Sequence, residues 1–400
     1  SGVSKGEWAS VPIIKGNNWG VKLEIYSAEH QVSHGWTSPL PMVSNPERTL
    51  VIAFGSANAY RRDPGPLVEL RSAFPGATIA GCSTAGEIFG PRVGDDSLSV
   101  AVVEFASARV NLAVADCGPG EDSFRAGELL AAQLDKPDLR GVLVLSDGLQ
   151  VNGSELVRGI SSLLAPGIPI TGGLAADGDR FERTWVLVDD TPVDRKVTAV
   201  GFYGDSIGFR HGSQGGWDIF GPERVITRSE GNVLYELDGR PALELYKSYL
   251  GELAEGLPAT GLLFPLAVRQ DPDDRYLVRT ILAVDERHQS LTFAGDVPQG
   301  RRAQLMQANF DRLIGGAEQA ANQARNGSSG PVLSIALSSV GRRVVLGDRT
   351  EEEVEATVER LTTGSHQVGF YSYGEISPYS DGTCNLHNQT MTLTTVSETV

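Results

Sequence analysis

A short pattern that occurs twice, each time at the end of an apolar run, constrains the fold of this chain most. Residues 81–88 read GCSTAGEI and residues 369–376 read GFYSYGEI, so both fit G-x-x-x-x-G-E-I. The preceding apolar runs are typical of buried strands. Because similar elements surround both copies, we infer an ancient internal duplication. Two similar layers facing each other would bring Glu87 and Glu375 to a common cleft.

The order of predicted elements around these copies recurs once more, in the middle of the chain. In each unit an apolar strand leads to a helix, a second strand, a loop and a further strand. The first strands are expected at residues 50–54, 141–145 and 332–337, and the helices at residues 66–74, 154–164 and 351–361. Ser154 is the expected N-cap of the second helix. The third helix is predicted to be acidic and amphipathic.

A block of different character separates the second and third units. Residues 223–228 and 232–237 are predicted strands, residues 241–250 a helix, and residues 301–324 a long helix. The glycine-rich segment 212–217 precedes this block and indicates a domain boundary.

Together these patterns predict an α/β (α+β) fold of mixed sheets, built from repeated β-α-β-loop-β units. We expect an N-terminal extension over residues 1–44, a first domain over residues 45–218 and a second domain over residues 219–400. The chain of 400 residues has a length that suits two or three ordinary domains. The two main domains are expected to share a cleft.

The charge of the chain argues against two classes of partner. Lys and Arg number 34 against 50 Asp and Glu, which gives a formal net charge of -16. A protein that binds nucleic acid or an anionic membrane needs a basic face. Basic residues are scattered here, so we expect neither nucleic acid nor membrane as a partner.

Cysteine usage and the absence of sorting signals indicate a compartment. The three cysteines, Cys82, Cys117 and Cys384, show no paired spacing. An odd, low count favours a reducing environment over a disulfide scaffold. No apolar stretch approaches the roughly 18 residues of a membrane span, and no signal peptide is visible. We therefore expect a cytoplasmic protein.

The loop at residues 81–85 permits several kinds of chemistry. It resembles the nucleophile elbow of a hydrolase, with Ser83 as the nucleophile. The residues that follow will not begin the long helix that an elbow needs, and Cys82 as a nucleophile meets the same objection. A tight turn that requires glycine is the structural alternative. We favour a ligand cradle, in which free backbone N–H groups bind an anion.

The histidines argue against a structural zinc site and leave a haem site open. None of the six forms a paired metal motif, and Cys-x-x-Cys is absent. A haem iron needs only one proximal histidine, which leaves no spacing signature. His211 and His387 each lie at a predicted strand edge among small or amide residues, and a hydrogen-bonded structural histidine is the alternative for both. Walker A and G-x-G-x-x-G motifs are also missing, and we do not expect an enzyme.

Three stretches resemble the FIST family, which has an N-terminal and a C-terminal FIST domain. They are residues 81–88, residues 221–243 (GPERVITRSEGNVLYELDGRPAL), and residues 369–376 followed by 387–393 (HNQTMTL). The resemblance covers about residues 45–400. It implies an intracellular sensor of small ligands, for which amino acids have been proposed. The chain is also similar to the NosP-type branch of haem proteins, which sense nitric oxide and act on a partner histidine kinase.

The resemblance to this branch implies a haem b site. We expect His211 to hold the iron, because the glycines after it would allow a large planar ring to approach closely, and His387 is the second candidate. Nitric oxide would bind the iron on its other side. The acidic helix at residues 351–361 is the candidate surface for the histidine kinase, since exposed charge favours steering toward a basic patch.

The resemblance to the wider family implies a metal-free alternative. An amino acid or related metabolite would bind in the cleft between the two Gly-Glu loops. Arg342 or Arg343 would pair with its carboxylate, and Glu87 or Glu375 with its ammonium group. The other expected ligand-binding residues are Cys82, Ser83, Thr84 and Tyr373. A serine hydrolase that uses Ser83 is the least favoured function, and a homo-oligomer is left open.

Overall fold

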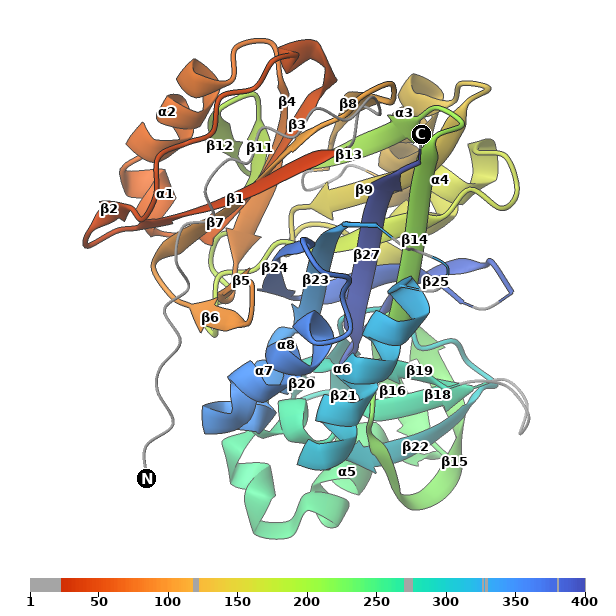
Figure 1. The fold of residues 1–400 in the computed structure, drawn as a ribbon. Coiled ribbons are helices and arrows are strands. Elements are labelled where there is room, and N and C mark those ends of the chain that lie inside the picture. The colour runs from red at the N-terminus through yellow and green to blue at the C-terminus, as the bar shows by residue number, and fades with distance from the viewer. Residues whose placement is uncertain are drawn as a thin grey trace, which may run out of the picture.

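The computed structural model describes residues 23–117, 122–269, 276–325, 327, 330–379 and 381–399. Three sheets make up a body, and a smaller β domain lies below it in the view of Figure 1. Sheets that mix parallel and antiparallel pairs, with helices between strands, confirm the predicted fold class. In the part of the chain that the structure describes, no helix is long and apolar enough to cross a membrane.

The body consists of three units with the same arrangement of strands. In each unit the first strand is parallel to the second and antiparallel to the last. The first strands are β3 (Thr49–Ser56), β9 (Leu139–Ser146) and β23 (Leu333–Ser339). The second strands are β4 (Thr78–Thr84), β10 (Ile170–Leu174) and β24 (His366–Ser372). The last strands are β7 (Ser97–Glu104), β13 (Lys196–Tyr203) and β27 (Met391–Glu398).

An edge strand precedes each unit and pairs with its last strand. These edge strands are β1 (Glu24–Gln31), which also pairs with β2 (Gly35–Trp36), β8 (Arg109–Asp116) and β14 (Ile207–Gln214). Residues 23–44 of the expected N-terminal extension thus supply a strand to the first sheet. Residues 1–22 lie outside the described residues.

Helices join the first and second strands of each unit, as predicted. They are α1 (Ala59–Arg62) with α2 (Gly65–Ala73), α4 (Gly153–Leu163), and α7 (Val340–Leu346) with α8 (Thr350–Val358). Single-turn helices η1 (Pro46–Arg48) and η4 (Gly347–Arg349) precede β3 and α8, and α3 (Ser123–Leu134) precedes β9. Asn152 is the N-cap of α4, because its Oδ1 accepts hydrogen bonds from the N–H groups of Ser154 and Glu155. The predicted cap at Ser154 was therefore two residues too late.

Each unit contributes a hairpin to the sheet of another unit. The hairpins are β5–β6 (Glu87–Phe89 and Arg92–Gly94), β11–β12 (Val186–Val188 and Thr191–Val193) and β25–β26 (Gly374–Pro378 and Cys384–His387). β5 pairs with β24, β11 with β4, and β25 with β10. This exchange closes a ring of three units, so the predicted duplication is in fact a threefold repeat.

Close strand packing explains the first glycine of the repeated motif. Gly81, Gly172 and Gly369 occupy the same place in the second strand of each unit. A Cβ at these positions would lie 2.0, 1.9 and 1.8 Å from a backbone oxygen of the neighbouring first strand. The second unit keeps this glycine but lacks the later Gly-Glu pair, which is why the sequence pattern is visible only twice.

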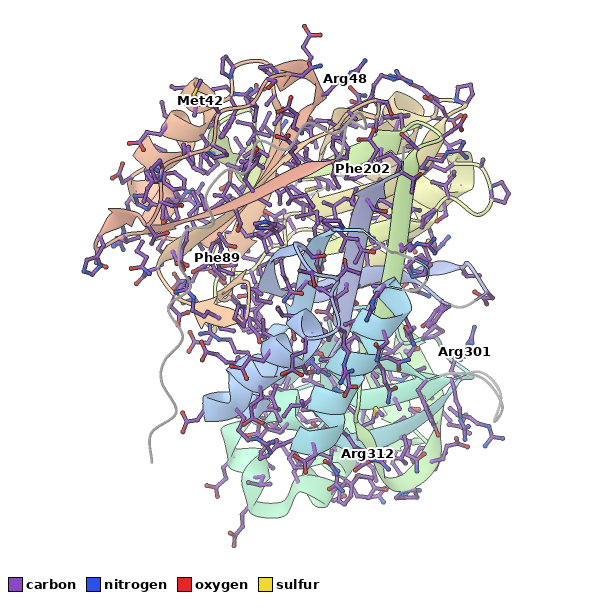
Figure 2. The ribbon with its side chains drawn as sticks, in the orientation of Figure 1. Met42, Arg48, Phe89, Phe202, Arg301 and Arg312 are labelled. Carbon is purple, nitrogen blue, oxygen red and sulfur yellow. The ribbon has the colours of Figure 1, made fainter. Side chains whose placement is uncertain are left out.

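The three sheets share one hydrophobic core. Phe54, Leu145 and Leu337 lie at the same position of the three first strands and belong to one buried cluster. The ring of Phe54 lies 4.7 Å from that of Phe370, between centroids. Phe202, labelled in Figure 2, belongs to the same cluster. The units therefore stabilise one another and fold as a single body.

Residues 218–307 form the β domain, which is inserted between β14 and α6 (Phe310–Arg325). Its strands are β15 (Asp218–Glu230), β16 (Val233–Leu237), β17 (Arg240–Pro241), β18 (Leu266–Arg269), β19 (Leu277–Arg279), β20 (Ile281–Asp285), β21 (Ser290–Phe293) and β22 (Arg302–Gln307). Its helices are α5 (Ala242–Leu250), η2 (Gly251–Gly256) and η3 (Ala259–Leu263). β19 and β20 lie at opposite ends of the strand order although only Thr280 separates them, so the sheet curls round on itself.

The predicted long helix over residues 301–324 was wrong in its first part. Residues 302–307 are β22, in which Ala303 and Leu305 are buried at alternate positions. Alternation of this kind fits a strand with period two. The helix begins only at Phe310.

The chain enters and leaves the inserted domain at neighbouring points. A Cβ on Gly216 would lie 2.2 Å from the backbone oxygen of Arg312, which is labelled in Figure 2. The guanidinium of Arg342 donates to the backbone oxygens of both Gly215 and Leu313. One buried side chain therefore holds the outgoing and the returning segment together.

Candidate functional site

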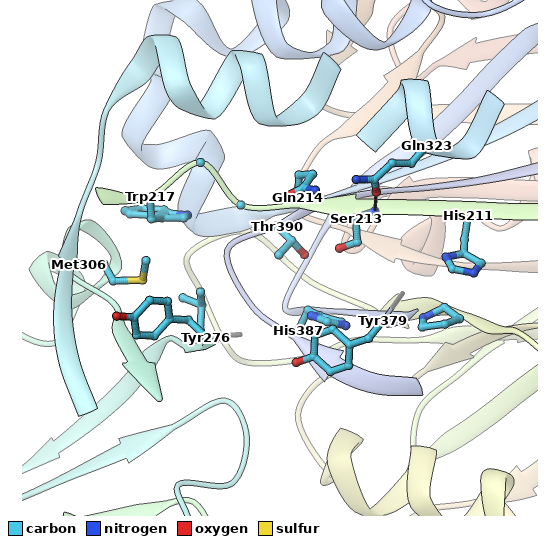
Figure 3. Close-up of a pocket in the computed structure, with 14 residues that line it drawn as sticks. His211, Ser213, Gln214, Trp217, Tyr276, Met306, Gln323, Tyr379, His387 and Thr390 are labelled. Atoms are coloured by element: carbon cyan, nitrogen blue, oxygen red, sulfur yellow. Dashed lines mark hydrogen bonds between the residues drawn. The ribbon is translucent and has the colours of Figure 1, made fainter. Parts of the chain in front are cut away.

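A pocket of about 660 Å³ lies where the body meets the inserted domain (Figure 3). Its volume is within the usual range for small-molecule sites. The body contributes residues from β14, α6, the β25–β26 hairpin and adjoining turns, and the inserted domain contributes residues near β19 and β22. The lining residues are His211, Ser213, Gln214, Gly215, Gly216, Trp217, Tyr276, Val278, Met306, Gln323, Pro378, Tyr379, His387 and Thr390.

The described lining of this pocket carries no formal charge at neutral pH. It contains no Lys, Arg, Asp or Glu. Burial lowers the pKa of His211, and it lowers the pKa of His387 to about 4, because an imidazolium loses hydration inside the protein. The pocket therefore offers aromatic faces, a thioether and neutral hydrogen-bonding groups.

His211 has an uncommitted imidazole. It lies on β14, paired in register with Thr394, and its ring is at one end of the pocket in Figure 3. Within the described residues, its ring nitrogens make no hydrogen bond. A neutral imidazole of this kind can act as a metal ligand.

His387 is more constrained, although it lies in the same pocket. Its Nε2 lies 2.9 Å from the backbone oxygen of Ser377 and donates to it. Its ring packs edge-on against Tyr379, with 4.7 Å between centroids. Nδ1 is then the acceptor nitrogen of this tautomer, so only Nδ1 is left to contact a ligand.

The glycines after His211 serve packing against α6. A Cβ on Gly212 would lie 2.0 Å from the backbone oxygen of Ala320, and one on Gly216 would meet Arg312. Gly215 and Gly216 also line the pocket, so the close approach of a planar ring to this segment stays a prediction. The unbonded ring of His211 and the position of the segment at the domain crossing are further reasons to favour His211.

The two Gly-Glu loops are equivalent in structure and adjacent in space. The N–H of Tyr371, within the second copy of the motif, donates to the oxygen of Gly86 in the first. Glu87 accepts hydrogen bonds from Thr84 and Ser97, just as Glu375 accepts them from Ser372 and Thr390. Burial raises the pKa of Glu87 to about 7 and that of Glu375 to about 8. Both carboxyl groups thus have partners within the chain.

The other expected ligand-binding residues also point into the protein. Burial raises the pKa of the Cys82 thiol, and Ser83 Oγ accepts a hydrogen bond of 3.0 Å from the N–H of Trp185. Tyr373 donates to a carboxylate oxygen of Asp177. The sequence therefore identified His211 and His387, which both line the pocket, and a second group of residues that lies in the core.

Arg342 is fully buried and forms an ion pair with Glu353 of α8, with Nη2 and Oε2 2.7 Å apart. Glu353 Oε1 accepts from the hydroxyl groups of Tyr371 and Ser338. The guanidinium has these partners in addition to the two backbone oxygens at the domain crossing.

Several lining residues were missed by sequence reasoning. Trp217, Tyr276, Met306 and Tyr379 come from segments that lie far apart along the chain. The glycine-rich segment 212–217 was the one sequence signal for the position of the pocket. It marks the domain boundary, and the pocket lies there.

A pocket with an uncharged lining between a repeated α/β body and an inserted domain defines a small-molecule-binding protein. The family comparison agrees. The FIST N domain matches residues 49–240, and the FIST C domain matches residues 242–378. The chain belongs to the FIST family, and its domains are those of a ligand-binding sensor in signal transduction.

The relatives are themselves uncharacterised. A protein of Methanocaldococcus jannaschii is 25% identical over 236 residues, which cover 52% of this chain and 45% of that protein. A protein of Mycobacterium tuberculosis is 24% identical over 349 residues, covering 82% of this chain and 86% of that protein. The chain thus spans less than half of the archaeal relative and most of the mycobacterial one.

A cyanuric acid hydrolase structure from A. caulinodans aligns over 95% of this chain and 99% of its own. The TM-score is 0.34 and the identity 10%, too low to support an argument.

Proposed function

We propose that the protein is an intracellular sensor that binds haem b in the His211–His387 pocket, detects nitric oxide there and regulates a partner histidine kinase. The observation that carries the proposal is the uncommitted, neutral imidazole of His211 in a pocket with aromatic walls. A single histidine is enough to hold a haem iron.

The described residues of the pocket lining fit the iron and the apolar ring of such a group but include no cation for its propionates. His211 would hold the iron, because its ring nitrogens are not bonded elsewhere in the described structure, whereas His387 donates Nε2–H to Ser377. Trp217, Tyr276 and Met306 would give the group apolar contacts. When bound, the haem supplies the metal centre that nitric oxide binds.

The location of the pocket supports a signalling role. Because its walls come from both the body and the inserted domain, a bound ligand that fits one arrangement of the two favours that arrangement over others. The resulting shift is available to a partner without any catalytic step by this chain.

The helix α8 is the proposed kinase contact. Glu352 and Glu355 are exposed on it, whereas Glu353 faces inward to Arg342. If charge reversal of Glu352 and Glu355 leaves kinase binding and autophosphorylation unchanged, α8 has no part in the contact.

Absorption spectroscopy of protein expressed with a haem supply tests the proposal. We expect a Soret band that shifts when nitric oxide is added and is lost in His211→Ala. His288→Ala is the matched control, since His288 is exposed in a hairpin turn and bonds to Asp285. A colourless protein that takes up no haem, or an unchanged spectrum in His211→Ala, would overturn the assignment.

A metal-free sensor for a small metabolite is the second candidate. The described lining of the pocket contains no cation that could pair with the propionates of haem, which favours an uncharged ligand. An amino acid as the ligand stays a prediction. The residues that would bind it already have partners within the chain; they are Arg342, Glu87 and Glu375. Thermal stabilisation of a colourless protein by an uncharged metabolite would support this candidate.

A further inference from the structure

A second hollow adjoins the pocket at His211. It has a volume of about 370 Å³ and shares His211, Gln323 and Pro378 with the pocket. Its other lining residues come from β9, β14 and the turns before β10 and β26; they are Arg140, Gly167, Pro169, Phe209, Arg210 and Gly382. A ligand that fills the pocket can therefore extend past His211 into this hollow.

The charge of the second hollow differs from that of the pocket. The described lining of the pocket contains no Lys, Arg, Asp or Glu, whereas the described lining of the hollow contains two arginines and no acid. The pocket and the hollow together form one site that is uncharged at one end and cationic at the other. Such a site suits a ligand with an apolar body and an anionic end.

Arg210 has no partner for its guanidinium among the described residues. It precedes His211 on β14, its side chain is exposed, and it makes neither a hydrogen bond nor an ion pair there. The guanidinium lies beside Gly327, which follows α6. A free guanidinium binds a carboxylate through two parallel hydrogen bonds. Its single positive charge matches a carboxylate better than a phosphate group, which carries about two negative charges near neutral pH.

The position of β14 brings Arg210 and His211 to the same hollow. Adjacent residues of a strand point to opposite faces, but β14 is the outermost strand of its sheet, and one of its edges has no strand partner in the described structure. Side chains from both faces reach the space beside this free edge, and both residues line the hollow. A ligand that contacts His211 can therefore meet Arg210 one position along the strand.

Two further groups can bind an anion in the hollow. Gln323 Oε1 accepts the N–H of Ser213 at 3.3 Å, which leaves its amide nitrogen to donate to a ligand (Figure 3). Arg140 pairs with Asp205, but the two side chains are 45% and 90% exposed. An exposed ion pair contributes little to stability, so a ligand carboxylate can replace Asp205.

We propose that the site takes a ligand with a planar apolar body and a carboxylate, and that Arg210 binds the carboxylate with Arg140 and Gln323 beside it. The inference rests on the proposed function, because it concerns the ligand of the same pocket. If that ligand is haem b, its propionates would meet the cations that the pocket lining lacks. A cationic end distinguishes such a ligand from the uncharged metabolite of the second candidate.

Fluorescence titration with pyrenebutyrate, an aromatic carboxylate, and pyrenebutanol, its uncharged analogue, tests the inference without haem. We expect the wild type to bind pyrenebutyrate about tenfold more tightly than pyrenebutanol. Arg210→Gln should lose most of this preference, and Arg210→Lys, which keeps the charge, should retain most of it.

Arg287→Gln is the matched control for Arg210→Gln. Arg287 is exposed in a hairpin turn of the inserted domain, and its guanidinium also has no partner among the described residues. The control removes the same charge from the protein and should bind pyrenebutyrate as the wild type does. Pyrenebutyrate that does not bind, or that binds equally well to the wild type and Arg210→Gln, would overturn the inference.

A gain of affinity guards against misfolding as an explanation. Asp205→Asn removes the partner of Arg140, so it should raise the affinity for pyrenebutyrate. The rise should vanish when Asp205→Asn is combined with Arg140→Gln, because the two residues then no longer act on each other. An affinity that stays or falls in Asp205→Asn would show that Arg140 does not contact the carboxylate.

Hemin and hemin dimethyl ester, which lacks free carboxylates, separate this inference from the proposed function. We expect hemin to bind more tightly than the ester in the wild type, and Arg210→Gln to reduce the difference. If hemin does not bind but pyrenebutyrate binding depends on Arg210, the haem proposal fails and the carboxylate inference holds. If hemin and its ester bind equally well to both proteins, the carboxylate inference fails and the haem proposal holds.

Discussion

The hydrogen bonds and ion pairs that a side chain makes within the protein, more than its chemical type, distinguish the candidate residues from one another. His211 and His387 line one pocket, yet only His387 donates a hydrogen bond to a backbone oxygen. Arg342 was predicted to meet a ligand carboxylate, and in the structure it meets Glu353. Sequence supplies the residue types, but a partner on another helix is fixed only by tertiary packing.

Glu87 gives a prediction at this scale. Burial raises its pKa from 4.5 to about 7, so the folded state keeps the proton to higher pH than the unfolded state does. Its contribution to stability is fully present below pH 4.5 and is lost as pH rises through about 7. The slope is at most about 1.4 kcal/mol per pH unit. Glu87→Gln should flatten this fall in the free energy of unfolding.

Urea denaturation at a series of pH values measures the effect. Glu255→Gln, at an exposed position, is the control and should leave the slope as in the wild type. Equal slopes for Glu87→Gln and wild type would show that Glu87 ionises normally in the folded protein.

Single elements were predicted well where a periodic pattern depends on local contacts. The helices α2 and α8 begin one residue earlier than predicted. The prediction failed at residues 302–307, where Ala303 and Leu305 satisfy a strand pattern and the helical pattern of α6 begins only a few residues later. A short apolar run fits the period of a strand as well as that of a helix. Pairing with neighbouring strands then decides which of the two forms.

Glycine substitutions test the strand packing of the units. Gly369→Ala would place a Cβ 1.8 Å from the backbone oxygen of Ala336, so β23 and β24 must separate. We expect a loss of stability of about 1–3 kcal/mol or more. Gly315→Ala in α6 meets no atom within 4 Å and should raise stability by about 0.5–1 kcal/mol. Chemical denaturation measures the free energy of unfolding of both variants. Equal effects of the two substitutions would contradict the close approach of β24 to β23.

The whole molecule is a ring of three units with one insertion. The recurrence of units was visible in the sequence because each contains the same order of strands and a helix. The exchange of hairpins was not visible in the sequence, because the strands that pair with β5, β11 and β25 lie in other units. The pocket was hidden for the same reason: His211, Tyr276 and His387 are distant in sequence.

The inserted domain is expected to fold on its own. Its main cluster, which includes Ile226, Leu243 and Phe293, contains residues from within the insertion only. A fragment of residues 218–308 should therefore give a dispersed amide NMR spectrum and a cooperative thermal transition. A spectrum typical of an unfolded chain would show that the domain depends on the body.

Adjacent crossing points also determine how the inserted domain can move. Both covalent connections of the domain pass Gly215 and Leu313, beside the Arg342 guanidinium. Hydrogen bonds from Asn152 to Asp296 and from Arg279 to the Leu386 oxygen hold the domain against the body elsewhere. We expect a ligand that contacts both His211 and Tyr276 to join the two parts at a further place. Because Arg342 also pairs with Glu353, the crossing is linked to α8, the surface helix that we propose as the kinase contact.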